Sequence, residues 1–319
     1  MTCYSPIKGW RSKDLNESGK RGIVFNPAFG FQDMPVEVPC GQCIGCRLDR
    51  SRSWALRCMH EASLHSANSF ITLTYDSEHL PANANLNVGH FQKFMKRLRK
   101  HLYPNKIRFF QCGEYGSNDM DNPDHRVLYG LSALGRPHYH SIIFGYDFPD
   151  RVLLKKTQQG HYLYTSPLLT KLWPFGYNTI GDVTFDSAAY VARYVVKKVN
   201  GELAEDHYTR VNPDTGEVVG IKPEYTTMSR KPGIASDWFN KYKGDVYPKD
   251  FTTLKGKIVR PPKYYDALLE KEDIALFEKI KAKRTAYASK DNPDTTYERL
   301  IQRENVKKAQ AKMLKRKLD

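Results

Sequence analysis

Strand-like and helix-like segments alternate between residues 70 and 199, and their order limits the folds that this chain can adopt. Strands are expected at 70–75, 106–112, 137–146 and 177–183, and helices at 88–102, 167–173 and 186–199. The first of these strands is rich in β-branched and aromatic residues, and the first helix has apolar residues at three- and four-residue spacing. The β-α-β-β-α-β-α order predicts an α+β fold with a central antiparallel sheet flanked by helices.

The segments on either side of this core have a different character. The N-terminal region holds most of the cysteines and is expected to be irregular until a helix at 50–65. Residues 212–216 are rich in turn-forming residues between two strand-like runs, which predicts a hairpin. From residue 264 onward the chain is expected to be helical and charged, with a basic tail. The expected domains are a cysteine-containing region (1–69), a central domain (70–245) and a charged helical C-terminal region (246–319).

The net charge indicates the kind of partner. The 319 residues include 50 Lys and Arg against 35 Asp and Glu, a net charge of +15. Such an excess favours a polyanion, and nucleic acid is preferred over an acidic membrane surface because no strongly apolar amphipathic helix accompanies the basic residues. No signal peptide or membrane span is indicated, so no membrane partner is expected and the cytoplasm is the expected location.

Two histidines on one expected strand are candidate metal ligands. His138 and His140 alternate with Tyr139, so their side chains project from the same face, roughly 7 Å apart along the strand. Glu114 ends the preceding strand, and an antiparallel neighbour could bring its carboxylate to the same ion. Two imidazoles and a carboxylate leave coordination positions for phosphate oxygens or water. The alternative is a pair of hydrogen-bonded core histidines, and other acidic or imidazole ligands are available in the turn at Asp76, Glu78 and His79.

Two tyrosines on an expected helix are candidate nucleophiles. Tyr190 and Tyr194 are one helical turn apart, so both hydroxyls lie on one face, and Lys197 and Lys198 continue that side. A phenol with a pKa near 10 is a poor nucleophile at neutral pH, but an adjacent ammonium group and a metal-polarised phosphate would each ease its attack. The alternative is an aromatic stripe packed on the sheet.

These motifs occur together in a familiar order. They are the segment 70–75 with His79 and Pro81, then Gly113–Gly116, then Gly135–His140, and then Tyr190 and Tyr194 with the lysines that follow. In this order they resemble the replication initiators of the HUH endonuclease superfamily, and most closely those of the Microviridae, small single-stranded DNA phages, in the gokushovirus branch. The resemblance spans about residues 36–240, including the segment 228–234.

The resemblance implies an HUH/Rep-type nicking domain that uses Mg²⁺ or Mn²⁺. It implies that His138 and His140 bind the metal, that Glu114 is the third ligand, and that Tyr190 and Tyr194 form a 5′-phosphotyrosyl link at the phage origin. The 3′-hydroxyl would then serve the host polymerase, with a host helicase as a further partner, in the cytoplasm of the bacterial host. The rivals are a two-tyrosine HUH transposase, a metal-dependent nuclease that uses water, and a non-catalytic basic DNA-binding or packaging protein.

The cysteine spacing predicts a second metal site, which is structural. Three cysteines are separated by two residues each, Cys40, Cys43 and Cys46. Gly41 and Gly45 allow the backbone to turn tightly around a thiolate site. Cys3 or Cys58 could complete a zinc site, and Cys3 is preferred because Cys58 falls on the apolar side of the helix at 50–65. An iron–sulfur cluster and unrelated reduced thiols are the alternatives.

Basic side chains near these motifs are candidate phosphate contacts. They are Arg47, Arg50, Arg52 and Arg57 near the cysteines, and Lys93 and Arg97 on the helix at 88–102. In single-stranded DNA binding, such residues follow the backbone while nearby aromatic rings stack on bases. The alternative is that these charges only solvate an exposed face.

Overall fold

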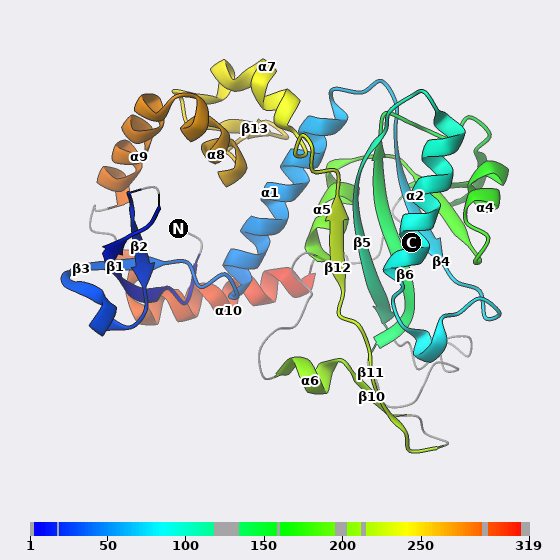
Figure 1. Cartoon of the computed structure of the whole chain (residues 1–319), viewed down its shortest axis with the longest axis horizontal. Helices are drawn as coiled ribbons and strands as arrows, with labels where there is room; N and C mark the ends of the chain where they lie inside the picture. Colours follow the sequence, from blue (N-terminus) through cyan, green and yellow to red (C-terminus); the bar gives the residue numbers. More distant parts are fainter. Residues whose placement is uncertain are drawn as a thin grey trace. The chain divides into compact units, whose positions relative to one another are not determined.

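The computed structural model of the chain describes residues 3–17, 19–117, 134–157, 160–194, 203–211, 215–288 and 293–313 (Figure 1). The chain divides into two compact units. The small unit consists of Met1–Arg50 and Lys283–Lys317, and the large unit spans Ser51–Ala282. Among the described residues, no helix is both long and apolar enough to cross a membrane.

A seven-stranded sheet is the centre of the large unit as described. Every neighbouring pair of strands in it is antiparallel, which confirms the predicted α+β class and antiparallel sheet. In spatial order the strands are β12 (Tyr225–Met228), β5 (Arg108–Ser117), β6 (Leu134–Phe144), β4 (Asn68–Thr74), β9 (Asn178–Gly181), β8 (Tyr162–Thr165) and β7 (Val152–Lys156). The sequence patterns did not predict β12, β8 and β7. All three lie toward the sheet edges, and β7 is exposed along its whole length, so it lacks the alternation that marks a half-buried strand.

Helices cover both faces of this sheet, and the side chains of each strand alternate between them. On the first face, here called the α2 face, Leu73 and Tyr139 pack with helices α2 (Val88–Leu102) and α4 (Pro167–Leu172). On the second, the α5 face, Phe70 and Ile142 pack with α5 (Phe185–Tyr194) and with residues of α1 (Ile44–Ala62) that belong to the large unit. Figure 1 shows α2 and α5 on opposite sides of the strands. The His-Tyr-His motif is therefore divided, with Tyr139 on the α2 face and both histidines on the other.

Helix positions agree with the periodicity where one face is buried. The helix α2 has the expected bounds, and its predicted apolar stripe is buried, including Phe91, Phe94, Met95 and Leu98. The helix α1 starts six residues earlier than expected, at Ile44, and therefore includes Cys46. For α5, residues 195–199 of the expected helix lie outside the described residues.

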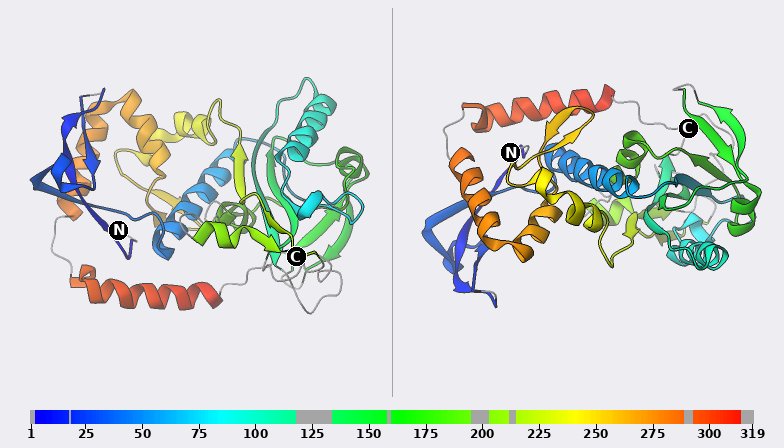
Figure 2. Two further views of the ribbon diagram at one scale, coloured as in Figure 1. Left: turned by 60° about the horizontal axis from the view of Figure 1, so that its bottom comes forward. Right: turned by 90° about the horizontal axis from the view of Figure 1, so that it is seen from above.

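The small unit corrects the expectation of an irregular N-terminal region. Strands β1 (Ile7–Leu15), β2 (Arg21–Val24) and β3 (Gly30–Val38) form an antiparallel sheet in the order β2-β1-β3. The three blue strands lie side by side in both views of Figure 2. These strands expose most of their side chains, so they lack the alternating apolar pattern on which strand prediction depends.

The two units do not coincide with the expected segments 1–69, 70–245 and 246–319. The expected boundary at 245/246 falls within helix α7 (Ser236–Val246), and Tyr265, Leu269 and Ile280 beyond it belong to the core of the α5 face. Long-range packing thus assigns residues up to 282 to the large unit. The predicted hairpin around residues 212–216 is confirmed by its two paired strands, although 212–214 lie outside the described residues. The remaining helices and strands are α6 (Leu203–His207), β10 (Thr209–Val211), β11 (Val218–Gly220), β13 (Thr252–Leu254), β14 (Lys257–Val259), α8 (Lys263–Glu272), α9 (Ile274–Ala288) and α10 (Tyr297–Met313).

Candidate active site

The pairing of β5 with β6 brings Glu114 to the two histidines. Glu114 lies directly across from His138, and Cys112 lies across from His140. The Nε2 atoms of His138 and His140 are each 2.9 Å from the same carboxylate oxygen, Oε1 of Glu114. One donor atom from each residue lies within 4.8 Å of the others, so the three side chains converge on a single point.

The other ring nitrogen of each histidine has its own partner. Nδ1 of His138 lies 3.0 Å from the backbone oxygen of Arg136, and Nδ1 of His140 lies 2.9 Å from Oγ1 of Thr72. If each Nδ1–H donates to these oxygens, each Nε2 presents its lone pair toward Glu114, as in a metal-binding histidine oriented by an outer hydrogen bond. The sequence interpretation missed Thr72. Its alternation places it on the same face as Phe70, but only the β4–β6 register brings it opposite His140.

Burial and charge act on Glu114 in opposite directions. Glu114 is 1% exposed and His140 is 2% exposed, whereas the side chain of His138 keeps 17% of its surface. Burial raises the pKa of the Glu114 carboxyl group, but the charges and hydrogen bonds of His138 and His140 outweigh it and hold this pKa well below the usual range. Glu114 is therefore a carboxylate. A carboxylate with two imidazoles is a donor set that fits a divalent cation and leaves coordination positions open.

Helix α5 brings one of the two candidate tyrosines to these histidines. The ring of Tyr190 lies 4.9 Å from the ring of His140 in an edge-to-face arrangement, and 6.4 Å from the ring of Phe70. Tyr190 is 9% exposed, so it both packs in the core of the α5 face and borders the candidate metal site. Tyr194 is the last described residue of α5. Its side chain, and the whole of Lys197 and Lys198, lie outside the described residues.

The basic residues expected to contact phosphate occupy different environments. Arg50 and Lys93 are exposed and Arg47 is half-buried. The helix that carries Lys93 and Arg97 covers the α2 face, opposite the histidines. The expected outward orientation of Arg97 is wrong, because it is half-buried and its Nε donates a hydrogen bond to the backbone oxygen of Leu172 at 2.8 Å.

Arg57 is also corrected by the structure. It is 8% exposed, and its guanidinium carbon lies 4.0 Å from the ring centroid of Trp54 and 3.8 Å from that of Tyr264. Its Nε and Nη2 both donate to the backbone oxygen of Ile234, at 3.2 and 3.0 Å. Next to it, Glu61 accepts a hydrogen bond from the backbone N–H of Ala235. Arg57 thus attaches the segment around residue 234 to α1 and is too enclosed to meet DNA.

We expect Arg57→Met to lower the free energy of unfolding by about 2–4 kcal/mol, because it leaves a buried carbonyl without its donor and removes two ring contacts. DNA affinity should stay within about threefold of that of the unchanged protein, because affinity comes from exposed charges. Urea unfolding and filter binding measure the two quantities. The matched control is Arg52→Met, at an exposed position of the same helix. A stable Arg57→Met protein with much weaker DNA binding would restore the phosphate role.

The cysteines fall into two groups. Cys3, Cys40, Cys43 and Cys46 come together in the small unit. Cys58 and Cys112 are fully buried in the core of the α5 face. The fourth member of the expected cluster is thus Cys3, as preferred from the sequence, and Cys58 is a core residue.

The fold and the site together define a DNA-replication class of protein only when relatives are considered. A family model for replication-associated proteins of the ORF2 kind matches residues 68–199, the stretch that carries β4, the two histidines, Glu114 and both tyrosines. This chain is 33% identical over 267 residues to replication-associated protein ORF2 of Spiroplasma virus 4, which covers 79% of this chain and 74% of the relative. It is 32% identical over 275 residues to replication-associated protein VP4 of Bdellovibrio phage phiMH2K, covering 83% and 76%.

A third relative is replication-associated protein ORF4 of Chlamydia phage 1, with 36% identity over 243 residues that cover 73% of this chain and 54% of the relative. The chain belongs to the family of phage replication-associated proteins. This confirms the resemblance to phage replication proteins that the motifs indicate. No solved structure matches the chain.

Proposed function

We propose that this protein initiates rolling-circle replication by cutting one strand of phage origin DNA and later rejoining it through tyrosine. The observation that carries the proposal is the convergence of both histidine Nε2 atoms on Glu114, with the ring of Tyr190 against His140. A nucleophile beside a divalent-cation site is the combination that phosphodiester transesterification requires.

In the proposed step, the hydroxyl oxygen of Tyr190 or Tyr194 attacks the scissile phosphorus. The Oη–P bond forms and the bond from phosphorus to the 3′-oxygen breaks. The phenol loses its proton and the departing 3′-oxygen gains one, so the products are a 5′-phosphotyrosyl link and a 3′-hydroxyl. One phosphodiester replaces another and no water is consumed, so the reverse reaction can join the strand again.

The residues around the tyrosine have distinct proposed roles. His138, His140 and Glu114 would hold Mg²⁺ or Mn²⁺, which when bound polarises the phosphate and stabilises the charge that develops on the leaving oxygen. The Thr72 hydroxyl and the Arg136 carbonyl fix the two rings, because each binds the nitrogen that faces away from Glu114. Since the ligands belong to neighbouring strands of one sheet, their spacing is set by the hydrogen-bonded register.

The proposed substrate and partners follow from this chemistry. The net charge of +15 favours binding to single-stranded DNA, with exposed residues such as Arg50 and Lys93 as phosphate contacts. The 3′-hydroxyl left by nicking is the end that a host polymerase extends, and a host helicase would separate the strands ahead of it.

A denaturing gel tests the proposal directly. Labelled single-stranded oligonucleotides that tile the genome of the phage are incubated with the protein and Mn²⁺. We expect one oligonucleotide to give a shortened 3′-hydroxyl strand and a slow band that protease removes. Cleavage without a slow band would instead indicate a nuclease that uses water, and binding without cleavage would indicate a non-catalytic DNA-binding protein. Replication of a plasmid bearing the cleaved site, as opposed to movement of a marked element, separates an initiator from a two-tyrosine transposase.

A further inference from the structure

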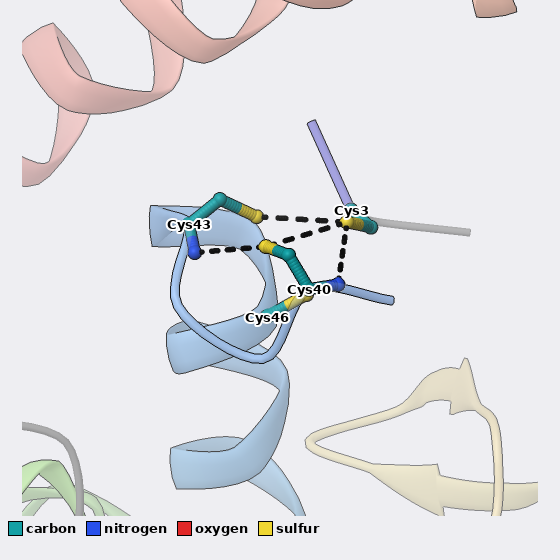
Figure 3. Close-up of side chains that lie close together, drawn as sticks. All are labelled: Cys3, Cys40, Cys43 and Cys46. Carbon is teal, nitrogen blue, oxygen red and sulfur yellow. Dashed lines mark hydrogen bonds between the residues drawn. The ribbon is translucent and has the colours of Figure 1, made fainter. Parts of the chain in front are cut away.

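The four cysteines of the small unit come from its two ends and from the start of a helix. Cys3 precedes β1, Cys40 follows β3, Cys43 lies just before α1, and Cys46 lies in the first turn of that helix. Figure 3 shows their side chains directed toward one another. We infer that these four cysteines bind one structural zinc ion as thiolates, and that this ion fastens the three-stranded sheet to the start of α1. The inference does not depend on the proposed nicking activity.

The distances between the sulfur atoms match those of a tetrahedral zinc site. Sγ of Cys3 lies 3.7 Å from Sγ of Cys40 and 3.9 Å from Sγ of Cys43. All four sulfurs lie within 4.8 Å of one another. With zinc–sulfur bonds of about 2.3 Å, tetrahedral geometry places neighbouring sulfurs about 3.8 Å apart. A disulfide would instead require about 2.05 Å, so the cluster has the spacing of metal ligands.

Backbone N–H groups surround the sulfurs as they do around metal-bound thiolates. Sγ of Cys40 accepts from the N–H groups of Gln42 and Cys43, at 3.4 and 3.2 Å. Sγ of Cys43 accepts from the N–H of Tyr4 at 3.3 Å, and Sγ of Cys3 accepts from the N–H of Cys40 at 3.3 Å. Hydrogen bonds to a charged acceptor stabilise it, and such outer partners orient the ligands of a metal.

The backbone between Cys40 and Cys43 makes the turn that this arrangement needs. Gly41 has a φ of 76°, in the left-handed region that glycine adopts without strain. Gly45, which was also expected to serve the turn, lies instead within α1. The turn therefore depends on Gly41, and the helix supplies Cys46 from its positive N-terminal end, where a thiolate is favoured.

The small sheet has too little core to hold itself together by burial. Among the described residues from 3 to 50, the one buried apolar side chain is that of Cys3. Large apolar residues of this sheet and its loops are exposed, including Ile7, Ile23, Phe25 and Phe29. Small folds without a sufficient core usually need a metal or disulfides. A zinc ion bound by Cys3 and Cys40 would join the chain before β1 to the chain after β3, and so close the loop that contains all three strands.

Metal analysis of the full-length protein tests the inference. For protein purified without chelator, we expect about one zinc per chain by inductively coupled plasma mass spectrometry, because four thiolates complete a closed site. Cys43→Ser should retain less than about a fifth of this zinc, and amide hydrogen exchange in β1–β3 should become at least about tenfold faster. The matched control is Cys58→Ala, which removes a buried cysteine of the large unit and should leave the zinc content unchanged.

Several outcomes would overturn the assignment. Unchanged zinc in Cys43→Ser would show that the metal is bound elsewhere, and iron with acid-labile sulfide would show an iron–sulfur cluster. A mass lower by two hydrogens for each cysteine pair, without metal, would show disulfides. His138→Ala should keep its zinc even when it cannot cleave DNA. Loss of zinc in that variant would place the ion at the histidine site and reject the cysteine site while the nicking proposal still stands.

Discussion

His138→Ala is expected to abolish strand cleavage while leaving DNA affinity nearly unchanged. His138 supplies one of the two imidazoles beside Glu114, and its loss should reduce metal-dependent cleavage on the order of 10³-fold, equivalent to about 4 kcal/mol of activation free energy. The dissociation constant for single-stranded DNA should change by less than about threefold, because phosphate attraction comes from many Lys and Arg residues. Cleavage rates with saturating Mn²⁺ and fluorescence anisotropy with labelled oligonucleotide measure the two effects.

His138 is the better position for this test because its side chain is more exposed than the almost fully buried His140. The matched control is His101→Ala, at an exposed position on α2, on the opposite side of the sheet, which should cleave normally. Glu114→Gln gives a second variant that keeps the size of the side chain and removes its charge. It should lose cleavage as well, with partial recovery at high Mn²⁺ concentration. If His138→Ala lost binding and cleavage in parallel while its melting temperature fell, the histidines would be structural.

The Tyr190→Phe/Tyr194→Phe double variant is expected to form no covalent adduct with DNA, a loss on the order of 10⁴-fold or more, as for removal of other catalytic nucleophiles. Each single variant should keep some nicking of an origin oligonucleotide but lose efficient release of circles. One tyrosine holds the 5′ end after the first cut, so a second free hydroxyl is needed to cut the regenerated origin. Adduct formation on gels and circle release from a plasmid origin measure these outcomes.

Phenylalanine keeps the ring of Tyr190 packed against His140 and Phe70 and removes only the hydroxyl. A tyrosine that serves only as a core residue would therefore change little in activity or stability. The matched control is Tyr103→Phe, at an exposed position just after α2. Mass spectrometry of the trapped adduct identifies the attached residue. An adduct that persisted in the double variant would show that another side chain is the nucleophile.

Several features of the chain could be read from the sequence because they depend only on local periodicity. Apolar residues at helical spacing gave the correct bounds for α2, since one face of a surface helix must be buried. The two-residue period of a strand correctly placed His138 and His140 on the same face and Tyr139 on the other. Periodicity failed for β1, β2, β3 and β7, whose side chains are mostly exposed and so carry no alternating pattern.

The assembly of the candidate sites depends instead on contacts between distant parts of the chain. Glu114 meets His138 across 24 residues of sequence, and Thr72 meets His140 across 68, because antiparallel register aligns them. A shift of that register by one residue would send Glu114 to the other face of the sheet. Local sequence does not determine register, and spacing alone could not choose between Cys3 and Cys58 as the fourth cysteine or show that Arg57 is enclosed between two aromatic rings. The sequence thus determined which residue types were available and on which side of each element they lie, and the tertiary structure decided which of them meet, because hydrogen-bonded pairing and core packing act between segments far apart in the chain.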